Sequence, residues 1–147
     1  MPQMPSQKTI AAWAWFFRAH RVLQDKIEAD LKAAGLPPLS WYDVLYLIYA
    51  APDRRVRQSE IGSKLLLPKY NLSRLLDRLA ARNLIVKTVR SDDKRGNFIE
   101  ISPAGKKLLK EMWTIYGSGI QRHFGEHYTA DELNRLRVLV SKVIDGK

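Results

Sequence analysis

The sequence predicts a mainly α-helical fold with one small β-hairpin, an α+β arrangement. Apolar residues recur at helical spacing over most of the 147 residues. Between residues 84 and 101, two runs rich in β-branched residues flank the charged segment SDDKRGN, a pattern typical of a hairpin. Just before it, Leu67 and Pro68 separate two helical patterns. Two helices joined by a tight break and followed by a hairpin form a winged helix-turn-helix.

The composition indicates one soluble domain spanning residues 1–147. With 46% hydrophobic residues the chain can bury a core, and its lack of cysteine excludes a disulfide framework, a Cys-ligated zinc site and a thiol redox sensor. We therefore expect a reducing, cytoplasmic compartment. The apolar run from Ile10 to Phe17 is short and is cut by Arg18, which argues against a signal peptide or a membrane span.

Positive charge is concentrated in the middle of the chain. The whole sequence has a net charge of +10, and residues 54–95 contain 12 Lys and Arg against 4 Asp and Glu, a net +8. A surface of this kind attracts a polyanion and gains salt-dependent affinity as counterions are released. The alternative is a basic face that is merely solvated.

The first two helices are predicted from apolar periodicity and from their end signals. A long amphipathic helix is expected from Lys8 to Ala34, where Gly35 and two prolines end the pattern. Ser40 is expected to cap a second helix that runs to Ala51.

The next two helices carry the predicted DNA contacts. Residues 58–66 form the first of them, and residues 69–82 form the second, on which four leucines make one apolar stripe. Polar side chains lie off that stripe toward the N-terminal half, the end that meets base edges in a helix-turn-helix. Arginine favours guanine and asparagine favours adenine. The predicted contacts are Lys69, Tyr70, Asn71, Ser73, Arg74 and Arg78.

The remaining elements follow from turn and capping residues. Gly96 and Asn97 can take positive φ in the hairpin turn. Ser102 is expected to cap a helix that starts at Pro103 and reaches roughly His127. Thr129 and Glu132 form a capping box for a final helix with a broad apolar stripe.

The central residues resemble the MarR family of winged-helix transcriptional regulators. The family's recognition-helix pattern is matched by SRLLDRL at residues 73–79, followed by Asn83-Leu84-Ile85. Its wing pattern is matched by Asp93-Lys94-Arg95, and the entry to its next helix by ISPAG at residues 101–105. Departures are modest, with Asn83, Lys87, Ser91 and Ser102 standing where the family often has Gly, Arg, Pro and Thr.

The resemblance implies a role for each part of the chain. Arg95 would enter the minor groove, Asp93 would brace the wing and Lys94 would contact phosphate. Residues 40–101 would form the DNA-binding lobe, and helices in residues 8–34 and 103–147 would join a second copy in a two-fold dimer that binds a pseudo-palindrome. The alternatives are plain surface ion pairs, of Asp93 with Arg95 and of Asp77 with Arg74 or Arg78.

Two further patterns suggest ligands. His123 and His127 belong to an H-x-x-E-H sequence, which in zinc peptidases binds metal. Gly125 weakens the helix there and no third ligand is evident, so we expect no enzyme and no cofactor, and interpret the pair as solvated histidines rather than a regulatory metal site. Several aromatic and polar residues on the first two helices suggest a pocket for a small aromatic effector, although core packing explains them as well. The pocket residues are Trp13, His20, Trp41, Tyr42 and Asp43.

These observations predict a dimeric, sequence-specific regulator that binds double-stranded DNA and is not attached to a membrane. A ligand-responsive repressor fits best. The alternative is a winged-helix module that binds DNA without sequence choice or binds another protein.

Overall fold

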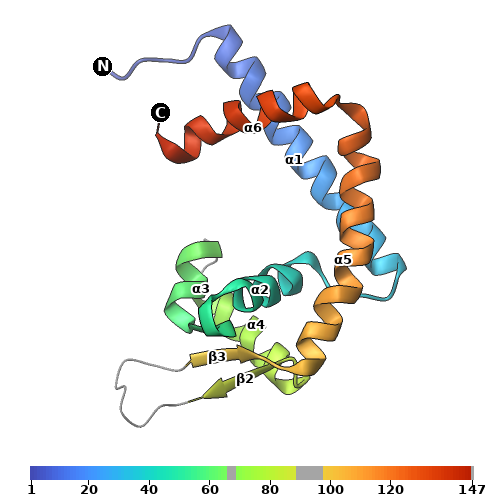
Figure 1. Cartoon of the computed structure of the whole chain (residues 1–147). Helices are drawn as coiled ribbons and strands as arrows, with labels where there is room; N and C mark the ends of the chain where they lie inside the picture. The colour runs from blue at the N-terminus through green and yellow to red at the C-terminus, as the bar shows by residue number, and fades with distance from the viewer. Residues whose placement is uncertain (66–68, 89–97, 147) are drawn as a thin grey trace. The chain divides into compact units, whose positions relative to one another are not determined.

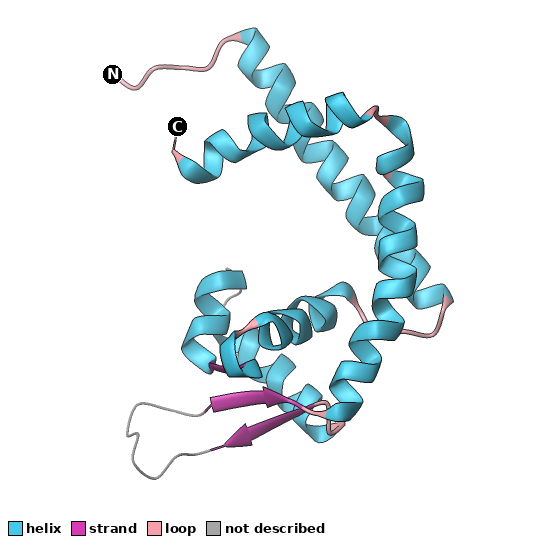
Figure 2. Ribbon diagram, viewed as in Figure 1, coloured by secondary structure: helices cyan, strands magenta, loops and turns pink. Residues whose placement is uncertain are grey.

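The computed structural model describes residues 1–65, 69–88 and 98–146. It divides into two compact units: a terminal unit of Met1–Asp30 and Tyr116–Lys147, and a central unit of Leu31–Ile115. The predicted α+β class is confirmed, because helices dominate and the strands form one small sheet (Figure 2). Within the described ranges, no helix has the length and apolar character needed to cross a bilayer.

The terminal unit is helical. It contains most of α1 (Gln7–Ala33), the second part of α5 (Pro103–His123), the short 3-10 turn η2 (Gly125–His127) and α6 (Ala130–Asp145) (Figure 1). α1 matches the predicted first helix to within one residue at each end. Gly119 of α5 allows close packing on α1, since a Cβ there would overlap the side chain of Ile27.

The predicted capping box of α6 is confirmed. Thr129 Oγ1 accepts a hydrogen bond from the Glu132 backbone N–H at 3.2 Å, and Glu132 Oε1 accepts one from the Thr129 N–H at 2.9 Å. These two bonds to Thr129 favour the ionised carboxylate and lower the pKa of Glu132. The sequence signal therefore locates the start of α6 correctly.

The central unit places four helical segments around a small sheet. They are α2 (Leu39–Ala50), α3 (Gln58–Leu65), α4 (Lys69–Ala81) and the first part of α5. The strands β1 (Arg55–Arg57), β2 (Ile85–Thr88) and β3 (Phe98–Ile101) form an antiparallel sheet in the order β1-β3-β2. A 3-10 turn, η1 (Pro52–Arg54), connects α2 to β1. The core consists of fully buried apolar side chains from these elements and, in the case of Leu31, from the last turn of α1. They are Leu31, Val44, Leu45, Ile48, Ile61, Leu76, Leu79, Ile99 and Met112.

Strand β1 is absent from the sequence prediction. Its three residues, Arg-Val-Arg, offer a single apolar side chain, which is too little for an alternating pattern. Pairing decides its conformation, because Arg55, Val56 and Arg57 align with Glu100, Ile99 and Phe98 of β3. Val56 then packs into the core while its two neighbours are half-buried on the other face.

Two predicted helix ends are wrong. Ser40 does not cap α2, because the helix already begins at Leu39. The N-cap position is therefore Pro38, which makes no side-chain capping bond. The Pro38 carbonyl accepts the first bond of the turn, from the Trp41 N–H at 3.0 Å. The helix expected to reach His127 ends at His123, since the backbone of Phe124 leaves helical geometry and continues as η2.

Ser102 joins the end of the sheet to α5. Its hydroxyl accepts a hydrogen bond from the Gly105 N–H at 3.0 Å and donates one to the Asn83 carbonyl at 2.6 Å. Asn83 has a φ of 59°, a left-handed conformation that asparagine tolerates better than most residues. Only glycine fits at position 105, because a Cβ there would overlap the Leu84 carbonyl oxygen. The predicted cap at Ser102 and helix start at Pro103 are confirmed.

We expect Ser102→Ala to lower the free energy of unfolding by about 1–2 kcal/mol, because it removes the cap of α5 and leaves the Asn83 carbonyl without its donor. Urea denaturation followed by circular dichroism measures the change. Ser102→Thr retains both hydrogen bonds and serves as the control. Equal stability of the alanine variant and the wild type would contradict this role.

Candidate nucleic-acid interface

Helix α4 has one buried face and one polar face. Leu72, Leu75, Leu76 and Leu79 are at most 6% exposed, so the helix packs on the core along the predicted stripe. The side chains of Asn71, Arg74 and Arg78 are exposed on the other positions. This rotation presents an amide and two guanidinium groups away from the protein, the donor and acceptor types that read base edges.

Ser73 connects α4 to α3. Its hydroxyl accepts a 3.2 Å hydrogen bond from the Gln58 side-chain amide, and the residue is half-buried. Gln58 is the first residue of α3 and was not among the predicted contacts. The only feature of the sequence that could have indicated its role is its place at the start of a helix. The bond braces the two helices of the helix-turn-helix against each other.

Asp77 forms an ion pair with the sheet. Its Oδ1 lies 2.7 Å from Lys87 Nζ on β2, and the two side chains are 70% and 30% exposed. Arg74 and Arg78 were the pairing partners considered for Asp77 in the sequence. Lys87 offsets the negative charge of Asp77 beside the exposed face of α4.

Several predicted contacts lie outside the described atoms. Lys69 and Tyr70 belong to the first turn of α4, although their side chains are not described. The wing residues Asp93, Lys94 and Arg95 fall in residues 89–97, beyond the described ranges. Their roles remain predictions.

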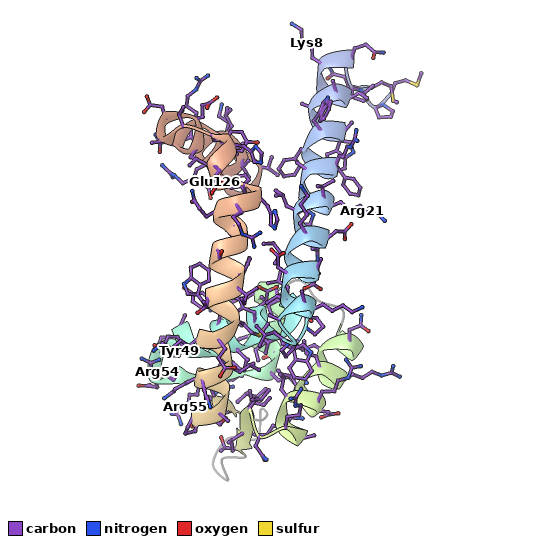
Figure 3. The ribbon with its side chains drawn as sticks, turned by 90° about the vertical axis from the view of Figure 1, so that its right-hand side faces the viewer. Lys8, Arg21, Tyr49, Arg54, Arg55 and Glu126 are labelled. Carbon is purple, nitrogen blue, oxygen red and sulfur yellow. The ribbon has the colours of Figure 1, made fainter. Side chains whose placement is uncertain are left out.

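A cluster of arginines on aromatic rings adds to this basic surface. Arg54 lies over the Tyr49 ring at 4.1 Å (Figure 3). Arg55 and Arg57 lie over the Phe98 ring at 5.0 and 5.1 Å. The hydrogen bond and positive charge of Arg54 lower the pKa of Tyr49. The sequence did not single out these arginines because it did not predict the strand that positions two of them.

The residues proposed for an effector pocket occur in both units. Trp13 and His20 lie on α1 in the terminal unit and are exposed. In the central unit, Trp41 and Tyr42 of α2 are each 8% exposed and Asp43 is exposed. Both buried rings have partners there, since the Tyr42 ring stacks on Trp113 and Arg82 lies over Trp41.

The two histidines of the H-x-x-E-H sequence have different surroundings. His123 Nε2 lies 2.7 Å from Asp30 Oδ2, which also accepts a 3.1 Å bond from Arg122, and the His123 side chain is 18% exposed. The expectation of a solvated His123 is therefore wrong. His127 is exposed in η2, beyond the end of α5, so the two rings are not one turn apart on a helix. Among the described residues, no three His, Asp or Glu side chains cluster as a metal site would require.

Comparison with known proteins agrees with this geometry. Residues 34–96 match the MarR family, a range that includes α2, the helix-turn-helix and the described part of β2. The HTH-type transcriptional regulator YkoM of Bacillus subtilis is 29% identical over 127 residues, which cover 86% of this chain and 80% of that protein. These matches support a MarR-type winged-helix protein that acts as a DNA-binding transcriptional regulator.

Two further proteins extend the match. The HTH-type transcriptional regulator MhqR of Bacillus subtilis is 26% identical over 115 residues, or 78% of this chain and 77% of that protein. Sco3205, a MarR family regulator from Streptomyces coelicolor solved in complex with DNA, has a similar fold. Its TM-score is 0.89 at 20% identity, with 99% of this chain and 91% of that chain covered. The MarR fold therefore spans both units of the chain.

We expect Asp77 and Lys87 to be coupled by about 0.2–1 kcal/mol, the range for exposed ion pairs. A double-mutant cycle of Asp77→Ala, Lys87→Ala and the double variant, measured by urea denaturation, gives the coupling free energy. The coupling should decrease at 1 M salt because exposed charges are screened. Additive effects of the two single substitutions would contradict the pairing.

Proposed function

We propose that this MarR-type protein is a dimeric, ligand-responsive repressor that binds a pseudo-palindromic operator. The observation that carries the proposal is the orientation of α4, whose leucine stripe is buried while Asn71, Arg74 and Arg78 are exposed. In a helix-turn-helix this polar face enters the major groove. Asn71 suits adenine, and the two arginines suit guanine.

The wing segment is proposed to make a second set of contacts with DNA. Asp93, Lys94 and Arg95 match the family's wing pattern, in which an arginine enters the minor groove. The strands that lead into and out of this segment are paired, with Thr88 opposite Phe98. Sco3205, which shares this fold, was solved in complex with DNA, and this supports DNA binding as the proposed function of the chain.

The exposed apolar side chains of the terminal unit support a dimer. No residue of α6, which is described throughout, is buried within the chain. Val143 and Ile144 are 87% and 81% exposed, and Trp13 and Phe17 of α1 are 65% and 55% exposed. Apolar surface of this extent indicates a partner, and a two-fold copy would match the symmetry of a palindrome.

The effector is the least constrained part of the proposal. Trp13, His20, Trp41, Tyr42 and Asp43 remain the proposed pocket residues, and a small aromatic molecule is the proposed ligand. The ligand would act by binding more tightly to the dimer conformation with one distance between the two DNA-binding lobes than to a conformation with another distance. We place the protein in the cytoplasm, where its operator is accessible.

Selection of bound sites from a random DNA pool tests the function directly. A palindrome enriched over successive rounds supports the operator, and its loss on adding an aromatic acid or phenol would identify the class of effector. Repeating the selection with zinc tests a regulatory role for His123 and His127. Equal affinity for selected and random duplexes at every salt concentration would instead indicate the module that binds without sequence choice.

Arg74→Ala and Arg95→Ala are each expected to weaken operator binding by about 1–3 kcal/mol, with a smaller loss on random duplex. Each removes a guanidinium proposed to contact bases, in the major and the minor groove respectively. Fluorescence anisotropy with both duplexes measures the two losses. Unchanged operator affinity for either variant would refute the contact assigned to that residue.

Val143→Asp is expected to raise the dimer dissociation constant by at least a hundredfold, because it places a charge on the apolar face of α6. Sedimentation equilibrium measures the change. Arg135→Asp adds the same side chain at an exposed position outside the apolar stripe and is the matched control. A Val143→Asp protein that stays as dimeric as this control would show that α6 does not form the interface.

A further inference from the structure

Two arginines of β1 share one aromatic ring. The guanidinium carbons of Arg55 and Arg57 lie 5.0 and 5.1 Å from the centroid of Phe98. Arg57 is paired directly with Phe98, and Arg55, two residues earlier, points to the same face of the sheet. Contact with the ring restricts both arginine side chains before any ligand binds, so less conformational entropy is lost when they bind an anion.

This pair lies where the wing meets the helix-turn-helix. Phe98 is the first residue described after the wing segment and is paired with Thr88, the last residue described before it. Arg57 directly precedes Gln58, which begins α3 and donates to Ser73 on α4. The two arginines therefore lie between the strand ends that flank the wing segment and helices α3 and α4.

The described residues near the pair include one carboxylate. Glu100 is aligned with Arg55 on the same face and offsets part of its charge. Arg54 continues the positive surface over the Tyr49 ring (Figure 3). The side-chain hydrogen bond with Arg54 is the main cause of the lowered pKa of Tyr49, followed by the positive charge of Arg54 and, to a smaller degree, that of Lys106.

We propose that Arg55 and Arg57 bind the phosphate backbone of duplex DNA at the base of the wing and do so without reading sequence. This contact rests on the proposed function, since it needs the recognition helix and wing to engage a duplex. Guanidinium groups match phosphate in charge and geometry. An acidic protein segment would also satisfy two arginines, but the direct connection to Gln58 and to the wing favours the nucleic acid.

The double variant Arg55→Ala/Arg57→Ala provides the test. Anisotropy titrations use the selected operator and a random duplex of equal length over a series of salt concentrations. Affinity should fall by the same factor on both, on the order of tenfold, and the slope of log K against log salt should decrease in magnitude by about 1.8, or 0.9 per phosphate. Arg55→Lys/Arg57→Lys keeps the charges and should retain most of the slope.

Arg18→Ala/Arg21→Ala is the matched control. It also removes two arginines, one of which lies 5.6 Å from the centroid of Trp15, but both belong to α1 and lie outside the basic residues 54–95. Its salt slope should equal that of the wild type. If it reproduces the loss seen in the β1 variant, net charge explains the effect and the proposed contact is overturned.

The remaining outcomes are equally decisive. Full retention of affinity and slope by the β1 variant overturns the contact alone, and so does a loss confined to the operator. A wild-type protein that binds no duplex overturns the proposed function as well. If the alanine variant does not fold, Arg57→Gln keeps the side chain over the ring without its charge, and its slope should decrease by about 0.9; an unchanged slope overturns the contact.

Discussion

Burial of the leucine stripe of α4 determines which side chains of this helix are exposed to solvent. Four leucines at most 6% exposed hold the helix at one rotation on the core. A turn of the helix by one residue would expose a leucine and bury an arginine, at a cost of several kcal/mol. Asn71, Arg74 and Arg78 are therefore exposed as a consequence of packing. The bond from Gln58 to Ser73 and the ion pair from Asp77 to Lys87 fasten the same helix to α3 and to β2.

The end of α4 is tied just as closely to the sheet and to α5. Asn83 turns the chain in the left-handed conformation, and its carbonyl accepts a hydrogen bond from the hydroxyl that caps α5. Gly105 lets the first turn of α5 approach the Leu84 carbonyl. The recognition helix, the base of the wing and the start of α5 thus share one compact junction.

The terminal unit has the opposite character. α6 buries none of its side chains within the chain, and large apolar residues of α1 remain exposed. Its local order comes from a capping box and from the pairing of Asp30 with Arg122 and His123, which joins α1 to α5. Helices that are well formed locally but unpacked along an apolar face are typical of subunits that complete their core on association.

The sequence by itself determined the features that depend on neighbouring residues: most of the helix ends, the leucine stripe of α4, and Ser102 and Thr129 as caps. Only the tertiary structure decided the features that depend on distant pairing. Strand β1 forms because β3 is beside it, and Arg55 and Arg57 gain a role only through Phe98, about forty residues away. His123 looked like a free helix-end residue until α1 supplied Asp30. The helix start at Leu39 was set by the Pro38 carbonyl rather than by the Ser40 hydroxyl. Capping and periodicity act over a few residues and can be read along the chain, whereas a strand of three residues or an ion pair between helices has no local signature.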